Sequence, residues 1–467
     1  MNTHLHTHLN INRHTSRREF LKRASAMSLA GVATPFAINL AAQGEAAAAN
    51  ATGYKALVCV FLYGGNDYAN TLVPYDAASH ALYTAQRPVI ATPRAVLAST
   101  LLNPATALGG GRQYAVAPQL SALLPIFDAG QMAVLLNIGT LVEPTSKAAY
   151  LNKSVRLPPK LFSHNDQQSV WQSSLAEGAT TGWGGRMGDL FAAGNGNATF
   201  TCVSVSGNAV YLSGSSAVQY QVTPNGSVPL SGLRNPLFGS QACSDALRAL
   251  VTAPRTHLYE AEHARIMKRS IDADVQLTSA LGGTSPIATP FPANNGLAAQ
   301  LAMVARMIKA RASTGAKRQV FFVSIGGFDT HDGLIDTHPG LLAQVGPALA
   351  AFNAATAELG VANEVTTFTA SDFGRTLTSD GDGSDHGWGS MHFVMGGAVR
   401  GKSFVGTPPA IANNGADDVG QGRLLPSLAV DQLAGTLGSW FGVSDSEMTT
   451  VLPNLSNYTV RNLGFMT

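Results

Sequence analysis

Four short motifs concentrate acids, imidazoles and an arginine in a chain of 467 residues, of which only 12% are charged. Carboxylates bind hard divalent cations, and imidazoles suit zinc and other transition metals. The predicted metal ligands are Asp67, Asp329, His331, Asp372 and His386. The sequence therefore predicts a site for one or two divalent ions, with zinc favoured and manganese, magnesium or calcium as alternatives.

Three further residues are candidates for catalysis. Ser163 would begin a helix, and a hydroxyl at a helix N-terminus beside a metal can act as a nucleophile; a plain N-cap is the alternative. His164 could be a ligand, a base or a buried structural histidine. Arg375 could hold a substrate anion with its fork of N–H donors, or it could form a structural salt bridge.

The stretch 371–392 is the richest in charge, with four aspartates and two histidines. Its segment DGDGSDHGWGSM begins like an EF-hand but lacks the glycine and the glutamate that this loop requires at positions six and twelve. An EF-hand is therefore excluded. We interpret Asp380 and Asp382 as solvated turn residues and His392 as a lesser site candidate.

Apolar runs that have the composition of buried strands are expected to hold these motifs in place. The runs cover 55–62, 132–138, 200–206, 319–325 and 364–371. Helices alternate with such strands in the later part of the chain, an order that predicts a mostly parallel sheet covered on both faces. Ligand sites in such sheets form beyond the carboxyl ends of the strands, where Asp67, Asp329 and Asp372 stand. We therefore expect these side chains to converge.

The remaining segments are less regular. Helices are expected at 258–281, around 297–308 and at 340–359. Residues 207–255 are rich in Gly, Ser, Asn and Pro and show no clear period, which indicates surface loops or short strands. We expect one domain over 51–467, with a loop-rich insertion at about 207–300.

The N-terminus has the pattern of an export signal over residues 1–50. The segment SRREFLK places paired arginines before an apolar run, 26–42, and an alanine-rich stretch follows, as in a twin-arginine signal. An uncleaved membrane anchor is the alternative, but the run is shorter than the ~20 apolar residues that a span needs. We expect a periplasmic or extracellular protein that meets the twin-arginine export machinery and has no transmembrane span when mature.

The charge balance argues against a nucleic-acid-binding protein, and the cysteine spacing against a cysteine zinc motif. The first 53 residues hold five of the 30 basic and two of the 28 acidic residues, which leaves 25 basic against 26 acidic residues afterwards. Such a chain lacks the basic face that nucleic-acid binding requires. The three cysteines match no zinc motif. Cys59 is expected in the core, whereas Cys202 and Cys243 could form one disulfide or remain two buried thiols.

Taken in order, GGNDYANT, FSHNDQQSVWQS, GGFDTHDG, SDFGRT and DHGWGS resemble the DUF1501 family of exported bacterial proteins. That family in turn resembles the alkaline phosphatase and sulfatase superfamily. The resemblance implies a three-layer α/β/α, alkaline phosphatase-like fold with metal ions at the strand ends. It also implies a two-metal hydrolase, here of phosphate or sulfate esters of a small molecule or an envelope polymer.

The order of the motifs also implies a role for each site residue. Asp67 would match the first metal-binding aspartate of the superfamily, and Asp372 the aspartate of its Asp-His-Gly motif. The other matches are Asp329 and His331 to the later aspartate–histidine pair, His386 to the last histidine ligand, and Ser163 or His164 to the vicinity of the nucleophile.

Two departures from the superfamily pattern affect the expected metal site. Its aspartate–histidine pair is spaced Asp-x-x-x-His, whereas only Thr330 separates Asp329 from His331. Phe373 stands where the superfamily has a histidine, and a phenyl ring cannot bind metal. We therefore expect the second metal site to be altered, weak or absent. The alternative function is a catalytically decayed relative that acts as a binding or assembly partner in the cell envelope, or that binds a polysaccharide through the 207–300 region.

Overall fold

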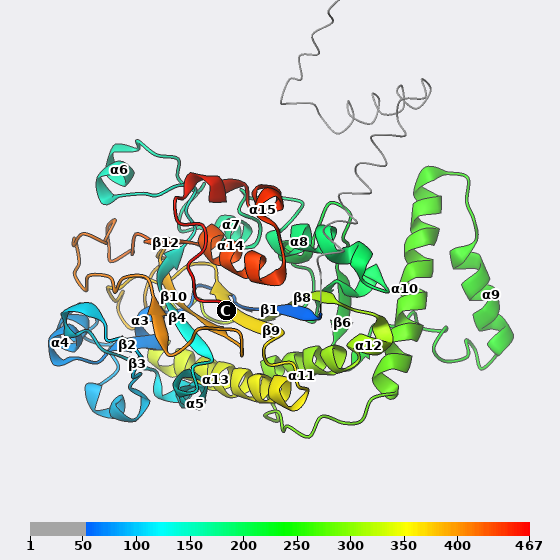
Figure 1. Ribbon diagram of the computed structural model, residues 1–467, viewed down its shortest axis with the longest axis horizontal. Helices are drawn as coiled ribbons and strands as arrows, with labels where there is room; N and C mark the ends of the chain where they lie inside the picture. The colour runs from blue at the N-terminus through cyan, green and yellow to red at the C-terminus, as the bar shows by residue number, and fades with distance from the viewer. Residues whose placement is uncertain (1–52) are drawn as a thin grey trace, which may run out of the picture.

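The computed structural model describes residues 53–467, and a ten-stranded sheet forms the centre of this part (Figure 1). The strand order is β11-β4-β10-β9-β1-β8-β5-β6-β7, and β12 also pairs with β4. The strands are β1 (Lys55–Leu62), β4 (Met132–Gly139), β5 (Cys202–Ser204), β6 (Tyr220–Thr223), β7 (Gly226–Ser227), β8 (Arg318–Ile325), β9 (Val365–Ser371), β10 (Ser390–Met395), β11 (Ser403–Val405) and β12 (Leu428–Ala429). A separate small sheet pairs β2 (Leu72–Pro74) with β3 (Tyr114–Val116).

Parallel pairing predominates in the central sheet. β1 lies between β8 and β9 and is parallel to both, whereas β10 is antiparallel to its neighbours β9 and β4. Every residue of β1 after Lys55 is buried, as expected for a strand covered on both faces. The predicted mostly parallel central sheet is therefore confirmed.

Helical layers cover the two faces of the sheet. Successive side chains of a strand point to opposite faces of the sheet. Val58 and Phe61 of β1 therefore belong to two different hydrophobic clusters, one on each face. One cluster includes α11 (Gly296–Lys309) and α13 (Leu334–Glu358). The other includes α7 (His164–Ser173), α8 (Trp183–Phe191), α14 (Val430–Phe441) and α15 (Asp445–Val451). Figure 1 shows the two sets of helices on opposite sides of the sheet, so the predicted three-layer α/β/α arrangement is confirmed.

Shorter helices complete the body. They are α3 (Tyr68–Thr71), α4 (Ala77–Gln86), α5 (Leu124–Asp128), α6 (Lys147–Asn152) and α12 (Arg311–Thr314). Strand boundaries agree closely with the sequence-based expectation, except that the run at 200–206 forms only the short β5. Two other departures are the earlier start of α13, at Leu334, and the strand β10, which was not expected.

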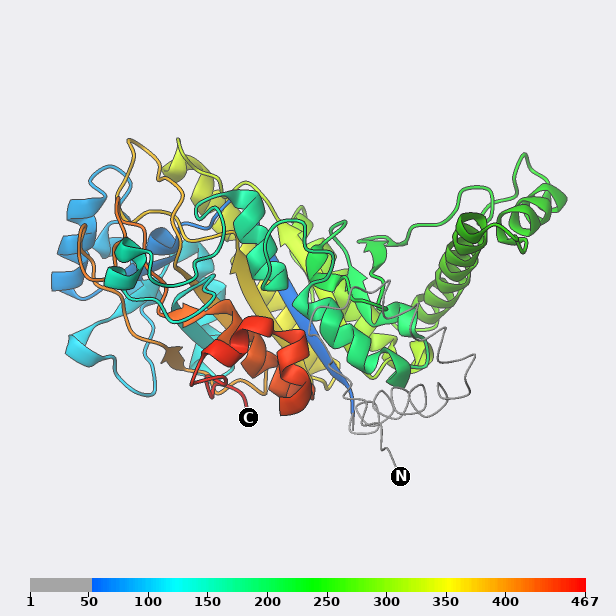
Figure 2. The ribbon, with the colours of Figure 1, turned by 90° about the horizontal axis from the view of Figure 1, so that it is seen from above.

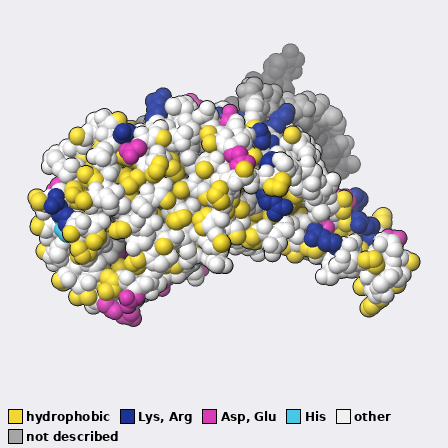
Figure 3. All heavy atoms as spheres, turned by 90° about the horizontal axis from the view of Figure 1, so that it is seen from below, with side chains coloured by type: hydrophobic (Ala, Val, Ile, Leu, Met, Phe, Trp, Pro, Cys, Tyr) yellow, Lys and Arg dark blue, Asp and Glu magenta, His cyan; other side chains and the backbone are white. Residues whose placement is uncertain are grey.

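The region predicted as surface loops contains a projecting helical arm instead. α9 (Gln241–Thr252) and α10 (Leu258–Gly282) extend away from the body, as Figure 2 shows. Figure 3 shows apolar and basic side chains side by side on this arm. The helix expected at 258–281 is confirmed, but α9 corrects the prediction that 207–255 has only loops or short strands. Its apolar residues have few partners, since only Ser244 of α9 is buried, and so they give a weak sequence signal.

The cysteines are free. Cys59 and Cys202 are buried in the body, and Cys243 is exposed on α9 of the arm. The alternative of a Cys202–Cys243 disulfide is thus not realised, and Cys243 is not the buried thiol that the other alternative required.

The predicted export signal lies outside the described residues. Among the helices of residues 53–467, none combines the length and the apolar character needed to cross a bilayer.

One buried acid gives the fold a testable pH dependence. Asp431 stands in the first turn of α14 and is 1% exposed. Burial raises its pKa from 3.8 to about 7, although the charge of Arg186 partly opposes this. An unfolded chain ionises this carboxyl near pH 4, so between pH 4 and 7 the unfolded state binds fewer protons than the folded state. Asp431 therefore makes the free energy of unfolding fall as the pH rises through this window, by up to about 1.4 kcal/mol per pH unit.

We expect Asp431→Asn to remove this slope, because the amide does not titrate. Urea unfolding at pH 4.5 and pH 7 should show the variant gaining stability over the wild type as the pH rises. Asp445→Asn, at an exposed acid that begins the next helix, is the matched control and should change the slope little. Equal slopes for wild type and Asp431→Asn would contradict the prediction.

Candidate metal centre

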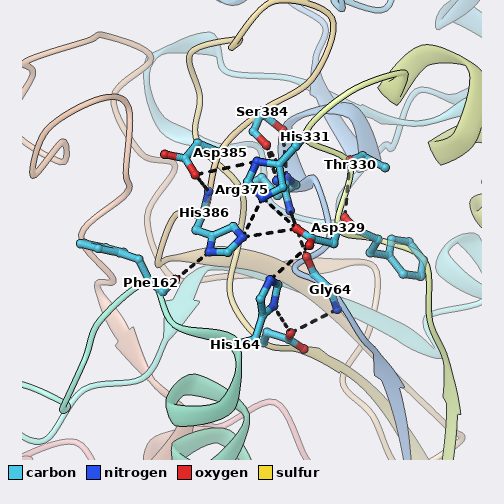
Figure 4. A network of polar contacts seen from close by, with 12 residues as sticks. Gly64, Phe162, His164, Asp329, Thr330, His331, Arg375, Ser384, Asp385 and His386 are labelled. Carbon is cyan, nitrogen blue, oxygen red and sulfur yellow. Dashed lines mark hydrogen bonds and ion pairs between the residues drawn. The ribbon is translucent and has the colours of Figure 1, made fainter.

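Three parallel strands end at the same level and bring the site together. Leu62 at the end of β1 is in register with Ile325 of β8 and Ser371 of β9. The loops that follow β8 and β9 carry two of the predicted motifs, and α7 begins beside them with His164. Figure 4 shows the resulting polar network beyond the strand ends.

Close approach of these loops requires glycine after β1. Gly64 has φ +115°, and a Cβ atom there would lie 2.4 Å from the backbone nitrogen of Asp329. Its own N–H donates to Asp372 Oδ2 (3.2 Å), and its carbonyl accepts from Arg375 (3.0 Å). The absence of a side chain thus lets the backbone of Gly64 approach the Asp329 loop and form hydrogen bonds with the side chains of Asp372 and Arg375.

Asp329 lies at the centre of the cluster, with three imidazoles around its carboxylate. Its Oδ1 is 3.1 Å from His331 Nε2 and 3.3 Å from His386 Nε2, and its Oδ2 is 3.4 Å from His164 Nε2. The Nε2 atoms of His331 and His386 are only 2.8 Å apart. All three rings therefore point the same nitrogen at one carboxylate.

The other ring nitrogens determine which atoms can bind a cation. His386 Nδ1 lies 2.7 Å from the carbonyl oxygen of Phe162, and His164 Nδ1 lies 2.6 Å from Asp372 Oδ2. Both partners are acceptors, so each Nδ1 carries the proton and the Nε2 of a neutral ring presents a lone pair. A carboxylate that faces several imidazole lone pairs is a repulsive arrangement without a cation and a typical one around a metal.

The donor set fits one divalent ion. His164 Nε2 is buried and has no hydrogen-bond partner, although it points toward Asp329. Metal bonds of ~2.0–2.2 Å at tetrahedral angles place ligand atoms roughly 3.3 Å apart, which is close to the separations around Asp329. Two overlapping groups of residues could hold an ion: His164, Asp329 and His386, and His331, Asp385 and His386.

Hydrogen bonds, burial and the charge of Arg375 shift the pKa values of the side chains in the cluster. Its hydrogen bond to Asp372 raises the pKa of His164, whereas burial lowers the pKa of His386. Burial alone would raise the pKa of Asp329, but the hydrogen bond and charge of Arg375 hold it below its ordinary value. The centre thus contains an ionised carboxylate.

An arginine that the sequence analysis missed holds the His386 segment in place. Arg423 donates to the carbonyl of His386 (2.9 Å) and to Asp385 Oδ2 (2.9 Å), and its guanidinium lies 4.5 Å above the Phe162 ring. Phe162 has φ +73°, a strained conformation for a non-glycine residue, and its carbonyl is the partner of His386 Nδ1. No motif marks Arg423, because its role depends on two segments distant in sequence.

Asp67, which was expected to be a metal ligand, forms an ion pair with Arg87 instead. Both of its carboxylate oxygens accept from Arg87, each at 2.7 Å, and both side chains are fully buried. A carboxylate engaged in this way has no oxygen turned toward the imidazoles. Its position after β1 was predicted correctly, but α3 begins there, and the side chain pairs with Arg87 at the C-terminal end of α4.

Asp372 and Arg375 lie at the cluster in supporting positions. Asp372 Oδ2 accepts from Gln168 (2.9 Å) as well as from His164 and Gly64, so this residue orients an imidazole and is not itself among the converging ligands. Arg375 is fully buried and donates to Asp329 (2.8 Å), Gly64 and Ser384. The alternative of a structural salt bridge therefore describes Arg375 better than a contact with a substrate anion.

Ser163 and His392 do not join the cluster. The hydroxyl of Ser163 donates to Asp166 Oδ2 (2.9 Å) and makes no hydrogen bond to a ligand residue. His392 is buried within β10 beside Trp171, and burial lowers its pKa to about 3. Asp380 and Asp382 are exposed, in agreement with their interpretation as turn residues.

Comparison with known proteins assigns the family. The model of the family described as "Protein of unknown function (DUF1501)" matches residues 54–451. The chain belongs to the DUF1501 family. No curated protein sequence matches this DUF1501 chain.

Solved structures resemble it only distantly. The PsFucS1 sulfatase from Pseudoalteromonas sp. is 10% identical, with 91% of this chain and 76% of that chain covered and a TM-score of 0.34. The lipoteichoic acid synthase LtaP from Listeria monocytogenes is 8% identical, with coverages of 88% and 81% and a TM-score of 0.33. The architecture of this DUF1501 protein is defined by its own strand order.

The Asp67–Arg87 pair leads to a prediction that separates stability from metal binding. Asp67→Ala leaves the Arg87 guanidinium buried without its counter-charge, which should cost about 3–5 kcal/mol of unfolding free energy. We expect folded Asp67→Ala to bind the same amount of zinc per chain as the wild type, measured by elemental analysis after dialysis. Loss of zinc with unchanged stability would show that Asp67 is a ligand after all.

Proposed function

We propose that this protein is a metal-dependent hydrolase of phosphate or sulfate esters. The observation that supports the proposal best is the convergence of three imidazole Nε2 atoms on the Asp329 carboxylate. His164, Asp329, His331 and His386 would hold a divalent ion, with zinc favoured by the three imidazoles. A bound divalent ion supplies Lewis-acid polarisation of an ester oxygen and activation of water.

The surrounding residues have distinct roles in this proposal. Asp372 holds the proton on His164 Nδ1, and Phe162 does the same for His386, so both rings keep Nε2 free for the ion. Arg375 fixes the rotamer of Asp329 through a 2.8 Å hydrogen bond. The side chains of Asp329 and His331 are 45% and 41% exposed, which leaves an open face for a substrate and for water.

Water is the nucleophile that the geometry favours. Among the described residues, no serine, threonine or tyrosine hydroxyl makes a hydrogen bond to His164, Asp329, His331 or His386. Ser163, the hydroxyl nearest in sequence, is hydrogen-bonded to Asp166. The proposed reaction is therefore a direct displacement at phosphorus or sulfur, without an ester bond to the protein.

Loss of a metal ligand tests the proposal. We expect His386→Ala to lose the bound ion and to lower kcat/KM by at least about 100-fold, because even residues that only orient a ligand cost 10- to 100-fold. Turnover of p-nitrophenyl esters and metal content should be measured on the same samples, with and without a chelator. His263→Ala, at an exposed histidine of the arm, is the matched control. Absence of metal from the wild type after zinc loading would overturn the proposal.

Ser163→Ala tests the choice of nucleophile. Removal of a covalent nucleophile costs about 10⁶-fold in kcat, whereas loss of a hydroxyl that only contacts Asp166 should change kcat by less than about tenfold. Activity that disappears while the metal content and the thermal midpoint are unchanged would assign the nucleophile to Ser163.

A catalytically decayed envelope protein is the second candidate. Two observations favour it: both oxygens of Asp67 are hydrogen-bonded to Arg87, and the buried Phe373 ring packs against His164 and His386, where it can bind no metal. This function predicts bound metal without turnover and a biological phenotype that survives His386→Ala. For either function we propose export through the twin-arginine route to the periplasm or beyond, on the basis of the SRREFLK segment.

A further inference from the structure

The acids at the strand ends supply ligands for only one ion. Both oxygens of Asp67 accept hydrogen bonds from Arg87. Asp372 Oδ2 accepts three hydrogen bonds, and its Oδ1, although without a partner, belongs to a carboxylate surrounded by the N–H donors of His164, Gln168 and Gly64. N–H donors repel a cation, so a second ion beside Asp372 would have a single ligand. Of the acids at the strand ends, Asp329 alone directs its carboxylate at the Nε2 atoms of the imidazoles.

Phe373 fills the space behind these imidazoles. Its ring centroid lies 4.9 Å from that of His164 and 4.7 Å from that of His386, and the side chain is 1% exposed. On its other side the ring is packed on Gly65, where a Cβ atom would lie 2.3 Å from the Phe373 ring. Phe373 therefore occupies this side of the cluster without offering a lone pair to a second ion.

The charges around the ion nearly cancel. Arg375 contacts Asp329, and Arg423 contacts Asp385, so each arginine neutralises one carboxylate. The remaining buried charge is Asp372, which faces His164. A single divalent ion added to these groups, with neutral imidazoles, leaves a net charge of about +1 at the open face.

We infer that the centre holds one divalent ion and acts on singly charged esters, namely sulfate esters or phosphodiesters, in preference to doubly charged phosphate monoesters. This inference rests on the proposed function and adds the number of ions and the substrate class. A monoanion matches the net charge of the site, whereas a dianion leaves one negative charge without a partner, because Arg375 is fully buried and each arginine already pairs with a carboxylate. Charge that lacks a partner in a partly desolvated site disfavours binding and the transition state.

The number of ions is measured first. Native mass spectrometry of the wild type loaded with zinc should show one ion per chain, and none for His386→Ala. Two ions per chain would overturn the inference and leave the proposed function intact. No ion would overturn both.

The substrate class is measured with three esters of one leaving group, two of them singly charged and one doubly charged. We expect p-nitrophenyl sulfate or bis(p-nitrophenyl) phosphate to be hydrolysed with a kcat/KM at least tenfold above that for p-nitrophenyl phosphate at pH 8. Comparison of the first two distinguishes a sulfatase from a phosphodiesterase. A preference for the monoester overturns the inference but supports the proposed function, and hydrolysis of none of the three overturns both.

Asp385→Asn tests the charge argument directly. It removes one negative charge and frees Arg423 from its ion pair, so the ratio of monoester to diester turnover should rise several-fold while one ion remains bound. The neutral variant Arg423→Gln should move the ratio in the opposite direction. Unchanged ratios in both variants would show that charge does not select the substrate.

Discussion

The parallel pairing of β1 with β8 and β9 brings together the loops that carry Asp329, Asp372 and Arg375. Because the three strands end in register at Leu62, Ile325 and Ser371, the loops that follow must share one small region beyond the sheet. Gly64 then permits backbone contact between these loops. Burial of the apolar strands on both faces stabilises the register, since a shift by one residue would turn their side chains to the wrong layers.

Around these strand ends, the protein uses its few buried charges in pairs. Arg87 neutralises Asp67 where both side chains are fully buried, and the buried Arg375 contacts Asp329 at the edge of the open face. Such pairs are expensive to desolvate but are even more costly when one partner is missing. Pairing therefore decides which carboxylate is available: Asp67 becomes structural, and Asp329 keeps oxygens directed at the imidazoles.

Much of the fold followed from local patterns. The strands at 55–62, 319–325 and 364–371 were predictable because a central parallel strand is apolar along its whole length, and this signal depends on no distant residue. α9 was missed because a helix of the projecting arm buries little, and β10 because it follows a glycine-rich segment and enters the sheet in the antiparallel direction.

For the site, the sequence by itself determined which ligand types are present. These are aspartates and histidines beyond strand ends, among them Asp329, His331 and His386. Tertiary structure alone decided the roles, because a role depends on what else occupies the neighbourhood. Arg87 approaches Asp67 from 20 residues away, and Arg423 reaches the His386 segment from 37 residues away. Neither approach leaves a local pattern, since hydrogen bonds and ion pairs are set by distance in space, which the order of residues does not specify.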